Sequence, residues 1–464
     1  KADPLWSILS GAGRRVGMVN VPVTYPPHPV NGVMVTCMLT PSLKSRFTYP
    51  DALREEFLAA VPDYAIEPMT PSSDLARTKA ELARNLVKTV EARATATRWL
   101  MQKLGDWDFF MTVFTEPDRL MTYAWDDFDP QHPRHDAASA RRYGDLFLRH
   151  YQHLDAVVGQ FAEAWLDKAT IFVLSDHGFA GVHRFFYPNV WLQQNGYLAL
   201  HRSARPSALA RARGIVRGLG VAHQAKKLAK RFFPDWGFTT GSRQADFVQA
   251  VDRQQTRVYW AADNGLTINL KGRQPQGIVE PADYEALRDE LIEKWQALRE
   301  PTTGDLAVEA IYRREEIYHG PYVTTSPDLR VVWKEYPQQR KVYCAAGELW
   351  AEDCWGYTGQ TGDHAPVGVL IAAGRHVAKG VSMSEAQITD IAPTVLYALG
   401  QPLPADMDGR VLREMFGAEF QSARHADSAP VAGAPAHAVG EAATYSAEEQ
   451  AQIEERLKAL GYLD

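Results

Sequence analysis

Three separated stretches of the chain place carboxylate and imidazole groups beside short apolar runs. Asp176 and His177 directly follow one such run, Asp118 follows another, and His364 lies in a glycine-rich segment that precedes a third. Aspartate oxygen and histidine nitrogen are good ligands for zinc and related divalent ions. Asp176 and His177 could therefore present both donors to one cation, and Asp118 and His364 are candidates for the same site.

Each of these signals has a simpler interpretation when it is taken alone. An Asp-His pair such as Asp176 and His177 is also typical of a helix cap followed by a surface histidine. Asp118 follows Pro117, and aspartate is common in turns beside proline. A single histidine in a glycine-rich loop, such as His364, is more often structural or exposed. The metal hypothesis depends on the three stretches meeting in the fold.

The elements that would position these residues alternate between helix and strand. Apolar spacing of three and four residues, or apolar runs, predicts helices at 4–12, 76–104 and 143–166 and strands at 16–23, 109–114 and 170–174. This alternation predicts an α/β fold with a mostly parallel sheet flanked by helices. Binding groups in such sheets gather where strands end at their carboxyl edge. Asp118 and Asp176 should therefore reach the same edge.

Composition divides the chain into several parts. We expect a core built from residues 1–200 and 331–417, a smaller α+β cap insertion at 201–330, a flexible linker at 418–443 and a terminal helix at 444–464. The linker is rich in Ala, Pro, Ser and His and could bury little apolar surface. Ser446 is a typical N-cap for the final helix.

A basic stretch at 201–231 has two interpretations. Lysine and arginine are frequent there, and no acidic residue follows until Asp235. The stretch could contact a membrane surface or another anionic partner. A solvated pair of helices on the cap is the interpretation that we favour.

Length and charge exclude few function classes. The chain has 464 residues, a formal net charge of −6 and a pI of about 6.2. Specific nucleic-acid binding is not expected, because such proteins are usually basic. A small phosphorylated substrate remains compatible, because a metal site supplies its own positive charge. No apolar run reaches the roughly 18 to 20 residues that a membrane span needs.

The three cysteines predict neither a zinc site nor a disulfide framework. Cys37, Cys344 and Cys354 form no CxxC pair. Cys344 and Cys354 are close enough in sequence to form a disulfide, but buried reduced thiols are the simpler interpretation.

Taken together, these segments resemble the type I phosphodiesterase/nucleotide pyrophosphatase family of the alkaline phosphatase superfamily. The resemblance covers nearly the whole chain. Its motifs are the segments Asn20–Pro27, Ser175–Phe179, Asn269–Arg273, Gly277–Val279, Asp390–Leu396 and Asp406–Arg410. The resemblance implies an alkaline-phosphatase-like fold and hydrolysis of phosphodiester or pyrophosphate bonds.

The resemblance also implies a site with two divalent metal ions, usually zinc, and a Thr or Ser nucleophile between them. By this resemblance, Asp176 and His177 bind the metal on the nucleophile side. Asp118 and His364 bind the second metal, which activates water. Two cations about 3.5 to 4 Å apart can stabilise both the entering and the leaving oxygen of an in-line displacement.

The sequence departs from the family pattern at two places. The family has a histidine four residues after the aspartate that matches Asp118, and here Thr122 stands there. Threonine is a much poorer zinc ligand than imidazole, although His132 or His135 could compensate. The family's first metal aspartate and its nucleophile match positions upstream of Lys1. We expect that residues precede Lys1, including any targeting sequence, so localisation is open.

Three functions are compatible with these observations. The first is a hydrolase of phosphodiesters or pyrophosphates that forms a covalent phospho-Thr or phospho-Ser intermediate. The second is another reaction of the superfamily, such as cleavage of phosphomonoesters, phosphonates or sulfates, or transfer of a phosphorylated headgroup. The third is a degenerate, non-catalytic relative that binds metal, which the threonine at position 122 and the unmatched nucleophile suggest.

Overall fold

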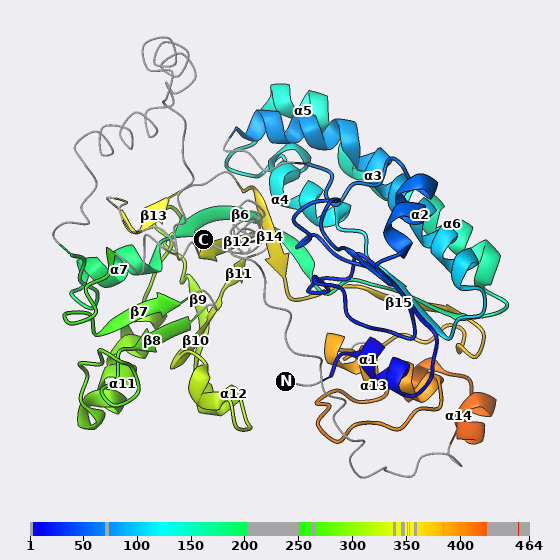
Figure 1. The fold of residues 1–464 in the computed structure, drawn as a ribbon. Coiled ribbons are helices and arrows are strands. Elements are labelled where there is room, and N and C mark those ends of the chain that lie inside the picture. Colours follow the sequence, from blue (N-terminus) through cyan, green and yellow to red (C-terminus); the bar gives the residue numbers. More distant parts are fainter. Residues whose placement is uncertain are drawn as a thin grey trace. The chain divides into compact units, whose positions relative to one another are not determined.

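The chain folds as two compact units. The computed structural model describes residues 3–69, 74–201, 250–261, 265–336, 340–344, 349, 351, 353–356, 360–383, 385–424 and 453 (Figure 1). Unit 1 contains residues 1–180 and 359–456, and unit 2 contains residues 181–358 and 457–464. All of the predicted metal ligands lie in unit 1.

The main sheet of unit 1 is mostly parallel. It contains β1 (Val16–Val19), β2 (Gly32–Val35), β3 (Thr48–Tyr49) and β4 (Phe109–Thr112) in the order β3-β2-β1-β4. The central strand β1 pairs in parallel with β2 and with β4, and β3 pairs antiparallel with β2. Because β1 and β4 run in the same direction, the chain leaves both strands at the same edge of the sheet.

Both faces of this sheet are covered, as the apolar run of β1 predicts. Val19 packs with α2 (Leu53–Ala60) and α3 (Leu75–Leu104) in one apolar cluster. The neighbouring residue Met18 points the other way, into a cluster with α1 (Leu5–Gly11) and α13 (Ile391–Ala398). Alternate side chains of a strand face opposite sides, so one strand supplies two cores. This arrangement confirms the predicted α/β fold.

Two further strands of unit 1 form a separate pair. β5 (Thr170–Leu174) runs antiparallel to β15 (Leu370–Gly374). Among the described residues, β5 pairs only with β15, and β4 pairs only with β1. Every residue of β1 is buried, but every residue of β4 and β5 is only half-buried. In the part of the chain that the structure describes, both strands therefore have an unpaired edge in spite of their apolar sequences.

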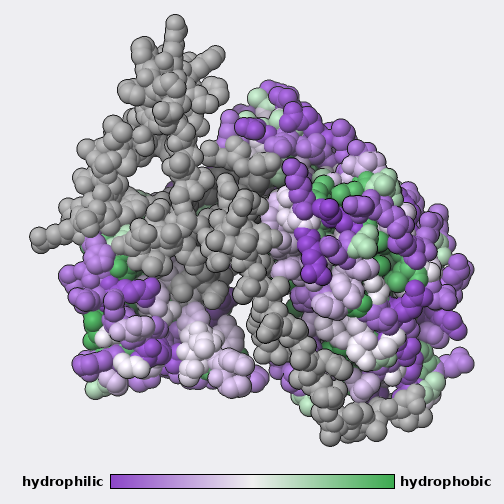
Figure 2. All heavy atoms as spheres, in the orientation of Figure 1, coloured by the Kyte–Doolittle hydropathy of each residue, from purple (hydrophilic) through white to green (hydrophobic). Residues whose placement is uncertain are grey.

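Long amphipathic helices form the outer layer of unit 1. The aspartate before α3, Asp74, accepts a hydrogen bond from the backbone of Arg77 and so caps the helix. α3 packs against α6 (Leu146–Trp165) and α4 (Glu116–Phe128). Hydrophilic side chains predominate over α3 and α5 (Ala137–Tyr143) on the surface shown in Figure 2.

Unit 2 contains an antiparallel sheet with a helix packed against it. The sheet has the order β7-β8-β10-β9 and consists of β7 (Val258–Ala261), β8 (Gly265–Ile268), β10 (Leu329–Trp333) and β9 (Val308–Arg313). α11 (Tyr284–Gln296) contributes Leu287, Leu291 and Trp295 to the core of this unit. These elements form the α+β fold that we predicted for the insertion.

A second sheet is built around the long strand β6 (Gly178–Phe186). It has the order β11-β12-β6-β13 and consists of β11 (Glu335–Tyr336), β12 (Arg340–Cys344), β6 and β13 (Trp355–Gly356), and β14 (Gly362–Ala365) also pairs with β6. After β6, the short helix α7 (Pro188–Gln194) contributes Trp191 and Leu192 to the apolar core of unit 2. β6 begins in unit 1, and its chain continues into unit 2.

The borders of unit 2 differ from the insertion that we predicted at 201–330. β10 pairs with β8 and β9, so residues 329–333 belong to unit 2 and not to a second part of the core. The unit also begins earlier, at Gly181. These borders depend on pairing between strands that are far apart in the sequence, and local composition does not indicate such pairing.

The predicted linker and terminal segments are described only in part. Residues 418–424, which we assigned to the linker, form α14 (Ala418–Arg424). Phe420 packs there against an apolar cluster that contains Tyr397 and Phe416, and this contact gives the helix a reason to form. The rest of the linker, nearly all of the terminal helix 444–464, and 202–231 of the basic stretch lie outside the described residues.

The three cysteines are free thiols, but only Cys37 is buried, and Cys344 and Cys354 are half-buried. Cys344 pairs in register with Phe186 on one side of β6, and Trp355, which follows Cys354, pairs with Phe186 on the other side. β6 therefore separates the two cysteines.

None of the described helices is long and apolar enough to cross a membrane.

The buried histidine of α6 gives a testable pH dependence. His150 is 2% exposed, and neither ring nitrogen has a hydrogen-bond partner among the described residues. Burial, and to a lesser extent the nearby His153, lowers the pKa of His150 to about 4. The unfolded chain binds this proton below its ordinary pKa of about 6.5, so acidification favours unfolding.

We expect the replacement His150→Leu to weaken the loss of stability in acid. Between pH 7.5 and pH 5, the free energy of unfolding of the parent protein should fall by about 2 kcal/mol more than that of the variant. Urea unfolding followed by circular dichroism at both pH values measures this difference. Equal losses in the two proteins would contradict the prediction. The variant His153→Leu removes only the smaller cause of the lowered pKa of His150 and should lose nearly as much stability in acid as the parent.

Candidate metal centre

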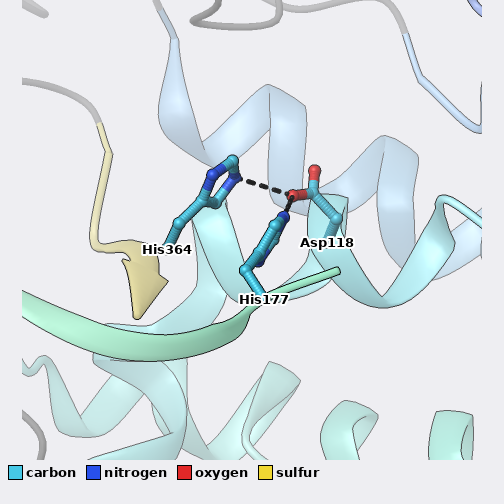
Figure 3. A group of neighbouring side chains, drawn as sticks. All are labelled: Asp118, His177 and His364. Carbon is cyan, nitrogen blue, oxygen red and sulfur yellow. Dashed lines mark hydrogen bonds and ion pairs between the residues drawn. The ribbon is translucent and has the colours of Figure 1, made fainter. Parts of the chain in front are cut away.

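Side chains from three distant stretches converge in unit 1 (Figure 3). Asp118, His177 and His364 each offer a ligand atom, and these atoms all lie within 4.8 Å of one another. His364 Nε2 lies 3.1 Å from Asp118 Oδ2, and His177 Nε2 lies 3.9 Å from the same oxygen. One carboxylate oxygen and two imidazole nitrogens thus point to one place.

The strand ends bring these residues together. Asp118 lies in the first turn of α4, directly after β4, where the N-terminus of a helix favours negative charge. His177 lies between the end of β5 and the start of β6. His364 lies on β14, which pairs with β6. This is the convergence that the sequence predicted for Asp118, His177 and His364.

Hydrogen bonding fixes the orientation of His177. Its Nδ1 lies 2.9 Å from the carbonyl oxygen of Gly178. A carbonyl can only accept, so Nδ1–H donates and Nε2 carries the lone pair. The ring stacks on His364 with a centroid distance of 3.6 Å, and Phe179 lies against both rings. A histidine held in this way has the tautomer that metal binding through Nε2 requires.

The fourth predicted ligand lies beside this group. Asp176 Oδ1 is 3.6 Å from His177 Nε2, and the side chain of Asp176 is 73% exposed. Its carboxylate is not one of the atoms that lie within 4.8 Å of one another. The role of Asp176 as a metal ligand therefore stays a prediction that rests on the family resemblance.

Two charged residues that the sequence did not predict hold Asp118. Arg119 Nη1 donates to Asp118 Oδ1, and Arg119 Nε donates to Glu67 Oε2 at 2.9 Å. Burial alone would raise the pKa of the Asp118 carboxyl. The hydrogen bond from His364 and the charge of Arg119 outweigh it, so the pKa lies below its ordinary value. Asp118 is thus ionised at neutral pH.

The turn before α4 is held by a buried arginine of α3. Arg93 is fully buried, and its guanidinium contacts the Glu116 carboxylate and the Thr115 hydroxyl. Asn20, at the end of β1, donates through Nδ2 to the carbonyl of Val113 at 2.9 Å. These contacts fasten the turn that carries Asp118 to both the sheet and the helical layer.

Thr122 lies one turn of α4 beyond Asp118 and is buried. Its carbonyl accepts a hydrogen bond from the backbone of Thr361 at 2.8 Å, close to the strand that carries His364. His132 and His135 do not join the candidate ligands: His135 Nδ1 contacts the Asp126 carbonyl instead. The compensation that we considered for these two histidines is therefore not seen in the described structure.

The architecture and the sequence together place the protein in a known group. An α/β sheet flanked by helices, with acidic and imidazole side chains at its strand ends, is the architecture that the family resemblance implied. The family model for type I phosphodiesterase / nucleotide pyrophosphatase matches residues 1–366. The chain belongs to this family of hydrolases. A comparison with curated protein sequences found no match.

Several solved structures are similar to the chain at low identity. A mutant of the alkaline phosphatase PafA is 16% identical, with a TM-score of 0.34, over 72% of this chain and 52% of that one. Human ectonucleotide pyrophosphatase/phosphodiesterase 5 is 11% identical, with a TM-score of 0.40, over 90% and 75%. Phosphonoacetate hydrolase from Sinorhizobium meliloti 1021 is 13% identical, with a TM-score of 0.35, over 86% and 73%. The chain thus spans about half the length of the PafA chain.

Removal of one imidazole tests the metal centre. We expect His177→Ala to lower zinc affinity by roughly tenfold or more, because even the loss of an outer partner of a ligand typically costs 10- to 100-fold. Zinc content after dialysis against a buffered zinc solution, measured by mass spectrometry, reports the change. His153→Ala, which removes a histidine outside the centre, should retain the parent's zinc content. Equal zinc in His177→Ala and the parent would remove His177 from the site.

Restoring the family histidine tests the second departure. Residues four apart on a helix lie on one face, so Thr122→His would place an imidazole on the face of Asp118. We expect zinc affinity to rise by about tenfold, because an imidazole ligand replaces a hydroxyl, which is a much poorer zinc ligand. Competition with a chromophoric chelator measures this affinity. Unchanged affinity would indicate that the buried position cannot direct an imidazole to the centre.

Proposed function

We propose that this protein is a metal-dependent hydrolase of phosphodiester or pyrophosphate bonds in small phosphorylated substrates. The convergence of Asp118, His177 and His364 in a member of this family is the observation that carries the proposal. We further propose two divalent ions, zinc by the chemistry of the donors, and a covalent phospho-Thr or phospho-Ser intermediate.

The donor set fits zinc. Zinc sites with catalytic roles combine histidine nitrogens with carboxylate oxygens and keep a position for water or substrate. Asp118 is ionised, and the tautomer of His177 leaves its Nε2 free to bind. His364 Nε2 would exchange its contact with Asp118 Oδ2 for a contact with the same cation. Bound divalent ions would supply Lewis acidity to the phosphoryl oxygens and lower the pKa of a bound hydroxyl or water.

The residues of this chain would bind the metal and orient one another as its ligands. Asp118 would offer Oδ2, while Arg119 holds Oδ1. The Gly178 carbonyl would keep the ring of His177 in position. Phe179 is buried against both imidazoles and would exclude water from that side of the centre.

We propose that the nucleophilic hydroxyl lies at the end of a further strand beside β4 or β5. β4 leads into the turn that carries Asp118, and β5 leads into His177, and each strand keeps one edge unpaired among the described residues. A strand that paired in parallel with either edge would end at the same side of the sheet as the centre. A residue at its end could reach a bound phosphate.

One observation favours a second candidate, a relative that binds metal without turnover. Thr122 replaces an imidazole of the family pattern, and its buried place in α4 offers only a hydroxyl. A centre with one ligand fewer would hold its second ion more weakly. Metal content and catalysis therefore need separate measurements.

Turnover by the full-length protein tests the proposal. After metal removal by a chelator and readdition of zinc, we expect cleavage of bis-p-nitrophenyl phosphate to exceed cleavage of p-nitrophenyl phosphate, phosphonate and sulfate esters. Asp118→Asn should lower kcat/KM by roughly 100-fold or more, which corresponds to about 3 kcal/mol. Asp145→Asn, at an exposed aspartate, should match the parent. Bound metal at less than two ions per chain, without turnover on any ester, would favour the second candidate.

A further inference from the structure

A buried chain of charged side chains leads from Glu67, in the segment between α2 and α3, to the metal centre. Glu67, Arg119 and Asp118 are linked in that order by two ion pairs. We propose that Arg119 is a positioning residue, anchored by Glu67, which fixes the Asp118 carboxylate so that only Oδ2 is available to the metal. This inference rests on the proposed function and concerns the same site.

Arg119 acts through Asp118 rather than on substrate. It is 1% exposed, and each part of its guanidinium is engaged: Nε with Glu67, Nη1 with Asp118, and Nη2 with the sulfur of Met38 at 3.0 Å. A group enclosed in this way cannot reach a phosphate. It contacts the centre at Asp118 Oδ1, the oxygen that does not face the two histidines in Figure 3.

The contact decides which carboxylate oxygen meets the cation. An aspartate has two equivalent oxygens and can bind a metal through one or both. Arg119 holds Oδ1, and Oδ2 is the oxygen that lies 3.1 Å from His364 and 3.9 Å from His177. A planar guanidinium binds two partners in a fixed geometry, which a lysine ammonium cannot reproduce. The side chain of Asp118 therefore loses its freedom to rotate.

Glu67 balances the positive charge of the Arg119 guanidinium. Its side chain is 7% exposed, and Oε2 accepts from Arg119. The formal charges of Glu67, Arg119 and Asp118 sum to −1, so the group as a whole attracts a cation. Without Glu67, the guanidinium would cancel the charge of Asp118 and lose the partner that holds it in place. Both effects would weaken metal binding.

Zinc affinity of the chain separates positioning from simple electrostatics. Removal of a positive charge beside a cation site would by itself tighten binding. If Arg119 positions Asp118, Arg119→Gln should instead weaken zinc binding by about 10- to 100-fold. Arg119→Lys keeps the charge but not the fork and should restore only part of the affinity. Glu67→Gln should weaken binding by about tenfold.

A second buried arginine provides the matched control. Arg288 in unit 2 is also 1% exposed and pairs with Glu315 at 2.6 Å. Arg288→Gln should lower the unfolding temperature, as Arg119→Gln should, but leave zinc affinity unchanged. Affinity is measured by chelator competition at a temperature where circular dichroism shows each variant folded, and the Co²⁺ absorption spectrum reports ligand geometry.

Each outcome decides the inference. Weaker zinc binding in Arg119→Gln and Glu67→Gln, with parent-like binding in Arg288→Gln, supports it. Parent-like or tighter binding in Arg119→Gln overturns it while the proposed function stands. If Arg119→Gln does not fold, Glu67→Gln decides alone, and unchanged affinity in that variant overturns the inference. A parent protein that binds neither zinc nor cobalt would instead overturn the proposed metal centre.

Discussion

A carboxylate that is removed from water must be paired, and the structure around Asp118 depends on this requirement. Only 16% of its side chain is exposed, and an isolated buried charge would cost several kcal/mol. The protein meets this cost with Arg119 on one oxygen and His364 on the other. The same contacts keep the group ionised and aim it at the two imidazoles. The contacts of Arg119 and His364 with Asp118 therefore both offset the cost of burying its charge and fix its position in the centre.

The sheet turns this local pairing into a site. Because β1 and β4 are parallel and in register, the chain leaves both strands at one edge, where the side chain of Asn20 fastens the end of β1 to Val113. Arg93 then ties the following turn to α3 through Glu116 and Thr115. Removal of one partner of a buried ion pair leaves an uncompensated charge, so Arg93 and Glu116 depend on each other. The position of Asp118 is thus set from the sheet side and from the helix side.

The sequence predicted the elements of the fold better than the contacts around the metal centre, because the elements depend on local spacing and the contacts join distant residues. Apolar periodicity predicted β1, β4, β5 and α3, because each element depends on local spacing. The group of Asp118, His177 and His364 was also predictable, since each residue adjoins a recognisable strand. Arg119 and Glu67 were missed because they are 52 positions apart, and nothing in their local sequence indicates the contact. The borders of unit 2 were missed for a similar reason: the pairing of β10 with β8 and β9 joins segments that are far apart.

The unpaired strand edges and the small ligand group have one physical explanation under the proposed function. Apolar strands with free backbone groups are costly in water and tend to acquire a partner. β4 and β5 are apolar, half-buried and unpaired on one side among the described residues, whereas β1 is fully buried between two neighbours. The same two strands lead into Asp118 and His177. A strand that paired in parallel with either edge would bring its own carboxyl end to the centre, where a hydroxyl could complete the chemistry. The same strand would then complete both the sheet and the proposed site.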